Sequence, residues 1–360
     1  MIDFFIKVKQ QEAQNLPFVI YKKPNKDKLV GYFQKNDHLF FAESLEETGF
    51  VFAPFENNQM LLLPKEQTVK VESKMSVVKL KTAENAEIPK NNTGKAAFKA
   101  LVQKALDSIA ASEMRKVVVS RKEVVSVPDF ELVSVFTKLL QSYPTAFCYC
   151  WYHPKIGMWI GATPEHLLFA KKKRFYTMAL AGTQKFENTT EVVWNSKEKD
   201  EQQFVTDFII ENLSEITTEI AVSSPYTLQA GNLVHIKTDI EGIVNANSNL
   251  KQVVSVLHPT PAVCGLPKAI AQKFLLENES YSREYYTGFL GELNKRGIKN
   301  EKVQSDLYVN LRCMKIEKDI QLGTTKAHLY MGCGITKDSD PQKEWKESVN
   351  KSMTMKKILF

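Results

Sequence analysis

The chain has 360 residues, and 43% of them are apolar, so it can bury a large core and is not a disordered polypeptide. Its 48 basic and 41 acidic residues give a formal charge of +7, and the scattered lysines favour a solvated surface over a nucleic-acid-binding patch. No stretch approaches the ~18 apolar residues of a membrane-spanning helix, so we expect neither a nucleic-acid partner nor a membrane association.

The cysteines and the N-terminus predict a reducing compartment. The five cysteines are an odd number, include no Cys-x-x-Cys pair and lie in apolar or glycine-bearing runs, as reduced core cysteines do. The N-terminus contains Asp3 and only a short apolar run before Lys7, so it lacks the charged and apolar regions of a secretory signal. The chain is therefore expected to be cytoplasmic.

The first part of the chain is predicted to form strands followed by a helix. From Phe18 to Leu63, short apolar runs alternate with turn formers, which predicts strands of a sheet. Residues 65–92 are rich in Lys and Glu, which predicts an exposed connection. Apolar residues from Phe98 to Ile109 then recur at the spacing of one helix face, and this helix leads into a β-branched strand at residues 116–121.

Helix and strand signals interleave over the rest of the chain. They predict helices near 131–142, 196–213, 250–257 and 267–276, and strands near 146–152, 157–161, 174–180, 234–240, 285–291, 307–316 and 327–330. The last predicted element is a helix with Asp340 as its N-cap and Pro341 at its first position. We find no internal repeat and no convincing linker, which favours one large α+β domain.

Two pairs of acidic residues lie on two of the predicted helices. Glu198 and Glu201 are three residues apart, as are Glu344 and Glu347, so each pair projects from one helix face. If the two helices meet, four carboxylates converge in a way that suits Mg²⁺. Acids near a helix N-terminus are, however, usually solvated and favoured by the helix dipole, so the pairs alone do not establish a metal site.

Three other segments are candidates for chemistry. Glu165 directly follows a Thr-Pro bend at a strand end, although, taken alone, an ordinary turn acid explains this position better. Lys116 begins the valine-rich strand, where a lysine is common at a strand edge. Residues 257–267 differ from both, because three prolines and a glycine within eleven residues impose an irregular backbone that packing alone rarely requires.

In combination, these segments resemble the chorismate-utilising enzymes, which comprise isochorismate, salicylate, anthranilate and aminodeoxychorismate synthases. The resemblance runs in order through Lys-Val-Val-Val-Ser-Arg from Lys116, Gly-Ala-Thr-Pro-Glu from Gly161, Ala181-Gly182-Thr183, the acidic helix around Glu201, Val234-His235-Ile236, His-Pro-Thr-Pro-Ala from His258, Leu311-Arg312-Cys313, Gly332-Cys333-Gly334-Ile335 and Glu344-Trp345-Lys346-Glu347. It implies the aminodeoxychorismate synthase fold, a single domain (1–360) of antiparallel β-sheets flanked by helices. Residues 1–95 would be its variable part and residues 96–360 its catalytic part.

The resemblance also implies roles for individual residues. Metal ligands fall on Glu201 and Glu347, with Glu198 and Glu344 in an outer acidic shell, and the ion is Mg²⁺. The general acid falls on Glu165. The substrate-binding positions are Ala181, Gly182, Thr183, His235, Arg312, Gly332, Gly334 and Lys351. One helix departs from the family pattern, because Glu198 and Gln202 stand where the family usually has Asp and His.

Two positions indicate which reaction to expect within the family. Anthranilate synthases use ammonia, which needs no activating base, and the resemblance implies that they have a glutamine at the place of Lys116. Aminodeoxychorismate synthases carry a nucleophilic lysine at the place of Ala181. Lys116 and Ala181 together therefore favour water as the nucleophile, activated by Lys116, which would need a neutral fraction, while Glu165 would need a raised pKa.

The expected activity is thus that of an isochorismate synthase, which adds water at C2 of chorismate as the C4 hydroxyl leaves. A salicylate synthase, which shares both residues and then eliminates pyruvate, stays open as an alternative. A catalytically silent chorismate-binding module is a second alternative. The family resemblance further implies a monomer without an obligatory glutaminase partner, and the product could feed menaquinone, siderophore or salicylate synthesis.

Overall fold

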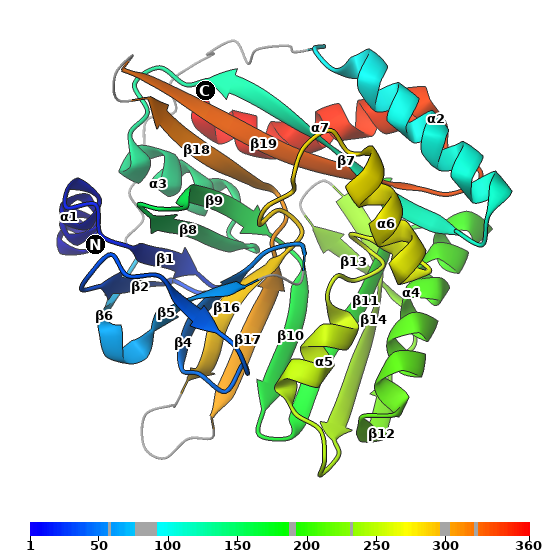
Figure 1. Cartoon of the computed structure of the whole chain (residues 1–360), viewed down its shortest axis with the longest axis horizontal. Coiled ribbons are helices and arrows are strands. Elements are labelled where there is room, and N and C mark those ends of the chain that lie inside the picture. Colours follow the sequence, from blue (N-terminus) through cyan, green and yellow to red (C-terminus); the bar gives the residue numbers. More distant parts are fainter. Residues whose placement is uncertain (57–58, 76–91, 187–191, 231–232, 296–302, 320–322) are drawn as a thin grey trace.

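Two antiparallel β-sheets form the centre of the molecule in the computed structural model, and helices cover their outer faces (Figure 1). The structure describes residues 1–56, 59–75, 92–186, 192–230, 233–295, 303–319 and 323–360. Every strand pair among these residues is antiparallel. The predicted α+β class with antiparallel sheets flanked by helices is therefore confirmed.

The elements are as follows. The first sheet runs, in spatial order, β15 (Gly265–Leu266), β7 (Lys116–Ser126), β19 (Thr324–Ile335), β18 (Cys313–Asp319), β9 (Gly157–Thr163), β8 (Phe147–His153), β1 (Phe18–Lys22), β2 (Lys28–Gln34) and β6 (Thr68–Lys74). The second runs β12 (Thr217–Val222), β14 (Leu233–Val244), β11 (Arg174–Lys185), β10 (His166–Lys171), β17 (Gln304–Val309), β16 (Phe289–Lys295), β4 (Gly49–Ala53), β5 (Met60–Pro64) and β3 (Phe40–Ala42), with β13 (Tyr226–Ala230) beside β14. The helices are α1 (Ile2–Ala13), α2 (Lys95–Ala111), α3 (Leu132–Ser142), α4 (Ser196–Ser214), α5 (Leu250–Leu257), α6 (Lys268–Asn278) and α7 (Pro341–Leu359), and a 3₁₀ turn spans Lys65–Gln67.

An aromatic layer joins the two sheets. Tyr149 and Trp159 from the first sheet and Phe52 from the second are all fully buried in it. Ring centroids approach to 4.3 Å between Phe52 and Tyr285 and to 4.2 Å between Phe147 and Tyr308. Stacked pairs of this kind contribute about 0.5–1.5 kcal/mol beyond the burial of their area. The layer therefore fixes how the sheets sit on each other, and with that the gap in which side chains from both can meet.

Helices cover the opposite face of each sheet. Apolar residues of α1, α3 and α7 pack on the first sheet, and those of α4 and α5 pack on the second. A further cluster joins α2, α6 and Trp345 of α7 to β7 and β19 (Figure 1). Strands place alternate side chains on opposite faces, so each strand supplies both the layer between the sheets and a helix-covered layer.

Most predicted helices are found where the sequence placed them. The residues from Phe98 to Ile109 lie in α2, and Leu250–Leu257 is α5 as predicted. Asp340 caps α7, because its Oδ1 accepts a hydrogen bond of 2.8 Å from the backbone N–H of Lys343, and Pro341 is the first helical residue. Such caps depend only on neighbours in the chain, and this explains why sequence patterns locate them.

The predicted connection at 65–92 is wrong in its first part. Residues 65–67 form the 3₁₀ turn and Thr68–Lys74 form β6, paired with β2 along seven residues, whereas residues 76–91 lie outside the described residues. The charged side chains that suggested a loop belong to an edge strand, where Lys and Glu are favoured because they discourage pairing with other chains. Sequence patterns also missed α1, β10, β12, β13 and β15.

The predicted strand at 307–316 is two strands that belong to different sheets. β17 ends at Val309 in the second sheet and β18 begins at Cys313 in the first. Between them Asn310 is fully buried, and its Oδ1 accepts a hydrogen bond of 2.5 Å from the Tyr149 hydroxyl. Arg312 adopts a left-handed φ of 46°. The crossing directs Arg312 to the gap between the sheets.

The predicted strand at 285–291 begins later than expected. β16 starts at Phe289, because Glu284 and Thr287 have φ values of 50° and 61°, which no extended strand accommodates. The irregular segment that results forms part of the wall of the site described below.

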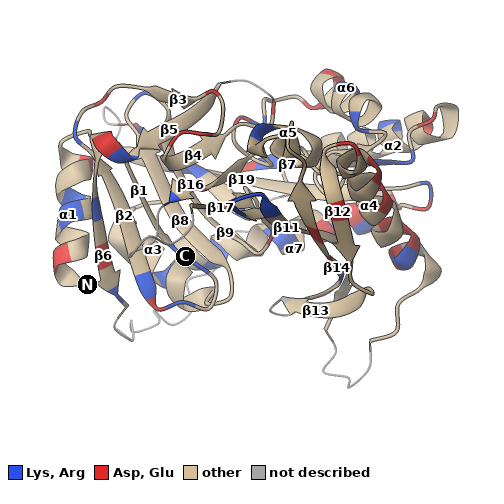
Figure 2. Ribbon diagram, turned by 90° about the horizontal axis from the view of Figure 1, so that it is seen from below, with Lys and Arg blue, Asp and Glu red and all other residues tan. Residues whose placement is uncertain are grey.

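All five cysteines are buried and free, as predicted. Among the described residues, no helix is long and apolar enough to cross a membrane. Figure 2 shows Lys and Arg interspersed with Asp and Glu along the ribbon.

Candidate active site

A cavity of about 220 Å³ lies where β7 and β19 of the first sheet approach β11 and β14 of the second, with α4 and α7 supplying acidic side chains. The predicted site residues that line it are Lys116, Glu165, Ala181, Gly182, Glu198, Glu201, His235, Arg312, Gly332, Gly334, Glu344, Glu347 and Lys351. The remaining predicted residue, Thr183, is part of β11, but its side chain is outside the part of the chain that the structure describes. The fold thus gathers these residues, while their chemical roles stay predictions.

Lys116 occupies the start of β7 and is almost fully buried, with 4% of its surface exposed. Its Nζ lies 2.6 Å from Oε1 of Glu201 on α4. Gly334 on β19 leaves room for this pair, because a Cβ at that position would lie 3.2 Å from Lys116 Cε and 3.6 Å from Glu201 Oε1. A glycine at 334 therefore lets a lysine and a carboxylate meet against the backbone of the neighbouring strand.

Glu165 is placed by the turn that follows β9. Its backbone N–H donates to Oγ1 of Thr163 at 3.2 Å, and its carbonyl accepts from the N–H of Val309 at 3.0 Å. Burial raises the pKa of the Glu165 carboxyl to about 7, against the opposing effect of the positive charges of Lys116 and Arg312. A carboxyl with this pKa is partly protonated at neutral pH, so it can donate a proton to a leaving group.

His235 lines the cavity as a neutral ring. Burial lowers its pKa to about 4, and its Nδ1 faces the Gly182 carbonyl oxygen at 3.1 Å. In the neutral ring Nδ1 therefore carries the proton and Nε2 is an acceptor. Gly182 itself sits at a bulge, where the β11–β14 register shifts, with a φ of 68° that favours glycine.

Helices α4 and α7 bring four carboxylates to the cavity. Glu347 Oε1 lies 2.6 Å from Lys351 Nζ, one turn further along α7, and Lys351 Nζ also donates to the Gly332 carbonyl at 2.8 Å. Glu198 accepts a hydrogen bond of 3.1 Å from the backbone N–H of Asn195, so it also stabilises the start of α4. Of the acids, Glu344 is the most buried, with 8% exposed.

Carboxylates, and not the nearby thiol, are the donors suited to a metal here. Cys333, Glu344 and Glu347 offer ligand atoms within 4.8 Å of one another. Burial raises the pKa of the Cys333 thiol, and its Sγ donates to the Glu344 carbonyl at 3.4 Å. The thiol therefore stays protonated, and it packs in the cluster that joins β19 to α2 and α7.

Gln202, where the family pattern has a histidine, is buried and held by hydrogen bonds. It is 2% exposed, and its Nε2 donates to the hydroxyls of Thr206 at 2.8 Å and Thr238 at 2.6 Å. The amide thus ties α4 to β14 one residue after Glu201. This contact holds in place the part of the helix that presents the acidic pair.

A buried ionic network fastens α7 to β7. Arg121 Nη1 lies 3.0 Å from Glu123 Oε2, and Lys356 Nζ lies 2.5 Å from Glu123 Oε1. Arg121 also donates from Nε to Ser348 Oγ at 2.8 Å, and its guanidinium lies 4.6 Å from the centre of the Trp345 ring. Because Ser348 and Trp345 flank Glu347, the network sets the rotation at which α7 presents its acids.

Glu123→Ala is expected to lower the free energy of unfolding by about 3–5 kcal/mol, because it leaves Arg121 and Lys356 buried without their shared carboxylate. Urea denaturation at pH 7.5 would measure the change. Glu317→Ala on β18 is the control, since Glu317 pairs with His328 at a position where its side chain is 61% exposed. A loss below 1 kcal/mol for Glu123→Ala would show that the network does not hold α7.

Several cavity residues escaped the sequence analysis. Tyr286, Thr287, Tyr330 and Thr336 also line the cavity. A Cβ on Gly332 would lie 2.8 Å from the Tyr286 hydroxyl, so that glycine makes room for the ring. These residues lie on ordinary strand and turn segments, and only the packing of the two sheets brings them to the cavity.

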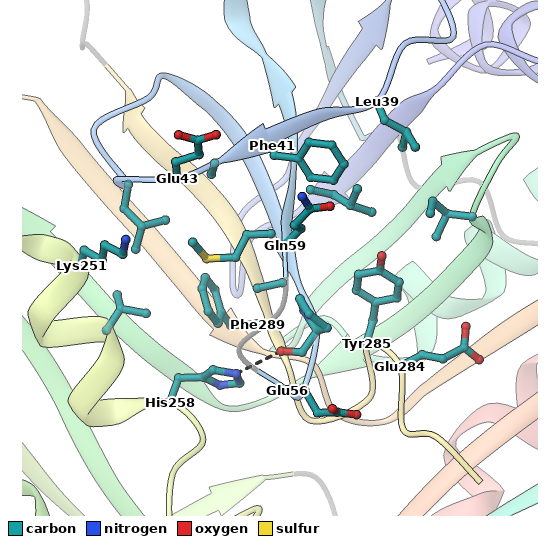
Figure 3. A pocket seen from close by; sticks show the side chains of 18 of the residues that line it. Leu39, Phe41, Glu43, Glu56, Gln59, Lys251, His258, Glu284, Tyr285 and Phe289 are labelled. Carbon is teal, nitrogen blue, oxygen red and sulfur yellow. Dashed lines mark hydrogen bonds between the residues drawn. The ribbon is translucent and has the colours of Figure 1, made fainter.

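A larger cavity, of about 1250 Å³, lies beside residues 284–287 (Figure 3). Its lining includes Phe41, Tyr285 and Phe289, with charged residues around them. His258 is held in its wall, because its Nε2 lies 3.1 Å from the Pro54 carbonyl, and burial lowers its pKa to about 4. The predicted segment 257–267 thus contributes to both cavities, since Ala262 and Val263 line the smaller one.

The smaller cavity is the better candidate for catalysis. Glu284 and Tyr285 face the larger cavity, whereas Tyr286 and Thr287 face the smaller one, so this short segment separates the two. Of these two cavities, as the described residues line them, it is the smaller that combines a carboxyl of raised pKa with a buried lysine and four further acids, and such groups cluster at catalytic sites.

The chain is similar to several known proteins. The profile of the family described as "chorismate binding enzyme" matches residues 53–360. The isochorismate synthase EntC of Escherichia coli (strain K12) is 28% identical over 286 residues, which cover 77% of this chain and 69% of EntC. The structure of MenF, the menaquinone-specific isochorismate synthase from Escherichia coli, has a TM-score of 0.77 at 22% identity and covers 96% of this chain and 89% of MenF. Anthranilate synthase component I from Streptococcus pneumoniae has a TM-score of 0.66 at 18% identity and covers 94% of this chain and 90% of its own.

Proposed function

Because this chain belongs to the chorismate binding enzyme family, we propose that it is an isochorismate synthase that uses Lys116 as base and Glu165 as acid. The observation that carries the proposal is that these two side chains line one cavity together with Ala181, the combination that favours water as nucleophile. The 28% identity to EntC, an isochorismate synthase, over 77% of this chain supports the same reaction.

The cavity's cations suit the substrate. Chorismate carries two carboxylates, and Lys116, Arg312 and Lys351 bring positive charge to the walls. Burial lowers the pKa of Arg312, but a guanidinium remains charged at neutral pH. Gly182, Gly332 and Gly334 line the same cavity and carry no side chain of their own. We propose that these groups bind and orient the two carboxylates.

Two proton transfers complete the reaction. Lys116, in its neutral form, removes a proton from a water molecule whose oxygen forms a bond to C2 of chorismate. The C4–O bond breaks as the two conjugated ring double bonds each shift by one position, and Glu165 donates the proton that lets the hydroxyl depart as water. Lys116 ends the reaction protonated and Glu165 ends it deprotonated. Each must therefore exchange a proton with solvent before the next turnover. Each such transfer contributes typically 10²–10⁴-fold to a rate.

The acidic residues fit a magnesium ion. Glu201 and Glu347 are proposed as its ligands, with Glu198 and Glu344 around them, since hard carboxylate oxygens are the donors that Mg²⁺ prefers. The lysines paired with Glu201 and Glu347 are consistent with a site built to hold positive charge. When bound, the ion would neutralise a substrate carboxylate and fix its position.

Further properties follow the family. We propose a monomer, as the family resemblance implies. We propose that it needs no glutaminase partner, because water and not ammonia is the nucleophile. We also propose that residues 96–360 carry the chemistry and residues 1–95 form the variable part. Among the described residues, those that line the smaller cavity all lie at or beyond position 116, which supports this division.

Purified protein incubated with chorismate and Mg²⁺ is expected to form isochorismate as the single product, resolved by reversed-phase chromatography with mass detection. EDTA should abolish turnover and excess Mg²⁺ should restore it. Formation of salicylate and pyruvate would instead assign the chain to the salicylate synthases. Complete absence of Mg²⁺-dependent turnover would favour the catalytically silent binding module.

A further inference from the structure

The two carboxylates proposed as metal ligands are each held by a lysine. Lys116 Nζ lies 2.6 Å from Glu201 Oε1, and Lys351 Nζ lies 2.6 Å from Glu347 Oε1. The two pairs differ in burial, because the side chains of the first are 5% and 22% exposed and those of the second are 21% and 41% exposed. The first pair is therefore the less screened by water, and breaking it has the larger effect.

The Lys116 ammonium repels a magnesium ion that binds Oε1 of Glu201. Magnesium binds oxygen at about 2.0–2.1 Å and requires near-octahedral geometry. With the ammonium still at hydrogen-bond distance from the same carboxylate oxygen, two cations would be only a few ångströms apart in a partly buried site. Their repulsion would be strong at the effective dielectric constant of such a site.

The Lys116–Glu201 pair borders the cavity. Gly334 lies directly against the pair and has no Cβ. A Cβ at this position would stand 3.2 Å from Lys116 Cε and 3.6 Å from Glu201 Oε1. Lys116 and Gly334 both line the cavity. A lysine displaced from Glu201 therefore has open space on the substrate side.

We propose that Lys116 is the internal counter-ion of Glu201 and that a divalent cation must displace it to bind. The inference rests on the proposed function in taking Glu201 as a metal ligand. In the metal-free enzyme the lysine neutralises the carboxylate and opposes metal binding. In the metal-bound enzyme the lysine is released toward the substrate, so that it faces chorismate only when the metal site is filled.

The affinity for Mn²⁺ without chorismate tests this proposal. Mn²⁺ prefers the same hard oxygen ligands as Mg²⁺ and is counted directly by electron paramagnetic resonance. Lys116→Met keeps the length of the side chain but removes its charge, and we expect it to bind Mn²⁺ at least tenfold more tightly than the wild type at pH 8. Lys116→Gln, which is neutral but polar, should change the affinity in the same direction if Lys116→Met does not fold.

Two further variants serve as matched controls. Lys116→Arg retains the positive charge, so its dissociation constant should be equal to or higher than that of the wild type. Lys199→Met removes a charge from an exposed position of the same helix as Glu201, and it should stay within about threefold of the wild type, because exposed charges are screened. Circular dichroism and thermal unfolding establish that each variant is folded.

The outcomes separate this proposal from the proposed reaction. Unchanged or weaker Mn²⁺ binding in folded Lys116→Met and Lys116→Gln would overturn the competition, even if the wild type forms isochorismate. Tighter binding in both would support it, also when the wild type binds too weakly to measure. Tighter binding combined with no turnover of chorismate would leave the competition standing and refute only the proposed reaction.

Discussion

Glu165→Gln is expected to lower kcat for chorismate by about 10²–10⁴-fold, because glutamine keeps the shape of the side chain but cannot protonate the departing hydroxyl. KM should change little, since no binding charge is removed when the residue is protonated. Initial rates at saturating Mg²⁺ would measure both constants. Glu211→Gln, at an exposed position of α4, is the control. A kcat within tenfold of the wild type would exclude Glu165 as the acid.

The same carboxyl predicts a pH dependence of activity. Burial raises the pKa of Glu165 from 4.5 to about 7, so the protonated acid is the major form below pH 7 and is lost as the pH rises through that value. The kcat/KM of the wild type should therefore fall on the alkaline side of about pH 7. Glu165→Gln should lack this limb in its residual activity.

Stability should respond in the opposite sense to the usual carboxylate. Between pH 4.5 and about 7 the folded chain holds a proton on Glu165 that the unfolded chain has lost, so this group lowers the free energy of unfolding as the pH rises through that window. The amide of Glu165→Gln is never charged. At pH 8, without metal, the variant should be more stable than the wild type by on the order of 2 kcal/mol, with little difference at pH 4.5. Equal stabilities at pH 8 would show that Glu165 is not held in a desolvated position.

Lys116→Ala is expected to lower kcat by about 10²–10⁴-fold at saturating Mg²⁺, because the attacking water loses its proposed base. Saturation with Mg²⁺ separates this loss from any change in metal affinity. Lys199→Ala, an exposed change on α4, is the control.

Lys116→Arg distinguishes a base from a fixed positive charge. A guanidinium retains the charge but is not deprotonated at any pH used for the assay, so it should not rescue the activity if Lys116 acts as a base. Recovery of a large part of kcat in Lys116→Arg would mean that the residue acts by its charge on the substrate.

What the sequence by itself determined was local. The spacing of apolar residues located α2 and α5, the Asp340-Pro341 pair located the start of α7, and the acids at i and i+3 identified helix faces that the structure brings to one cavity. These features depend on residues within one or two turns of each other, and their physical chemistry is the same in any surroundings. The ordered motifs added the candidate roles through their resemblance to a family.

Only the tertiary structure decided how these pieces meet. Lys116 and Glu201 are 85 residues apart in the chain, yet their atoms lie 2.6 Å apart, because β7 and α4 are brought together by the packing of two sheets. The same packing breaks the predicted strand at Asn310, directs Arg312 to the cavity and makes an edge strand of the charged segment at 68–74. The raised pKa of Glu165 is of this kind too, since it comes from burial, which depends on neighbours that are distant in the sequence and that no local pattern identifies.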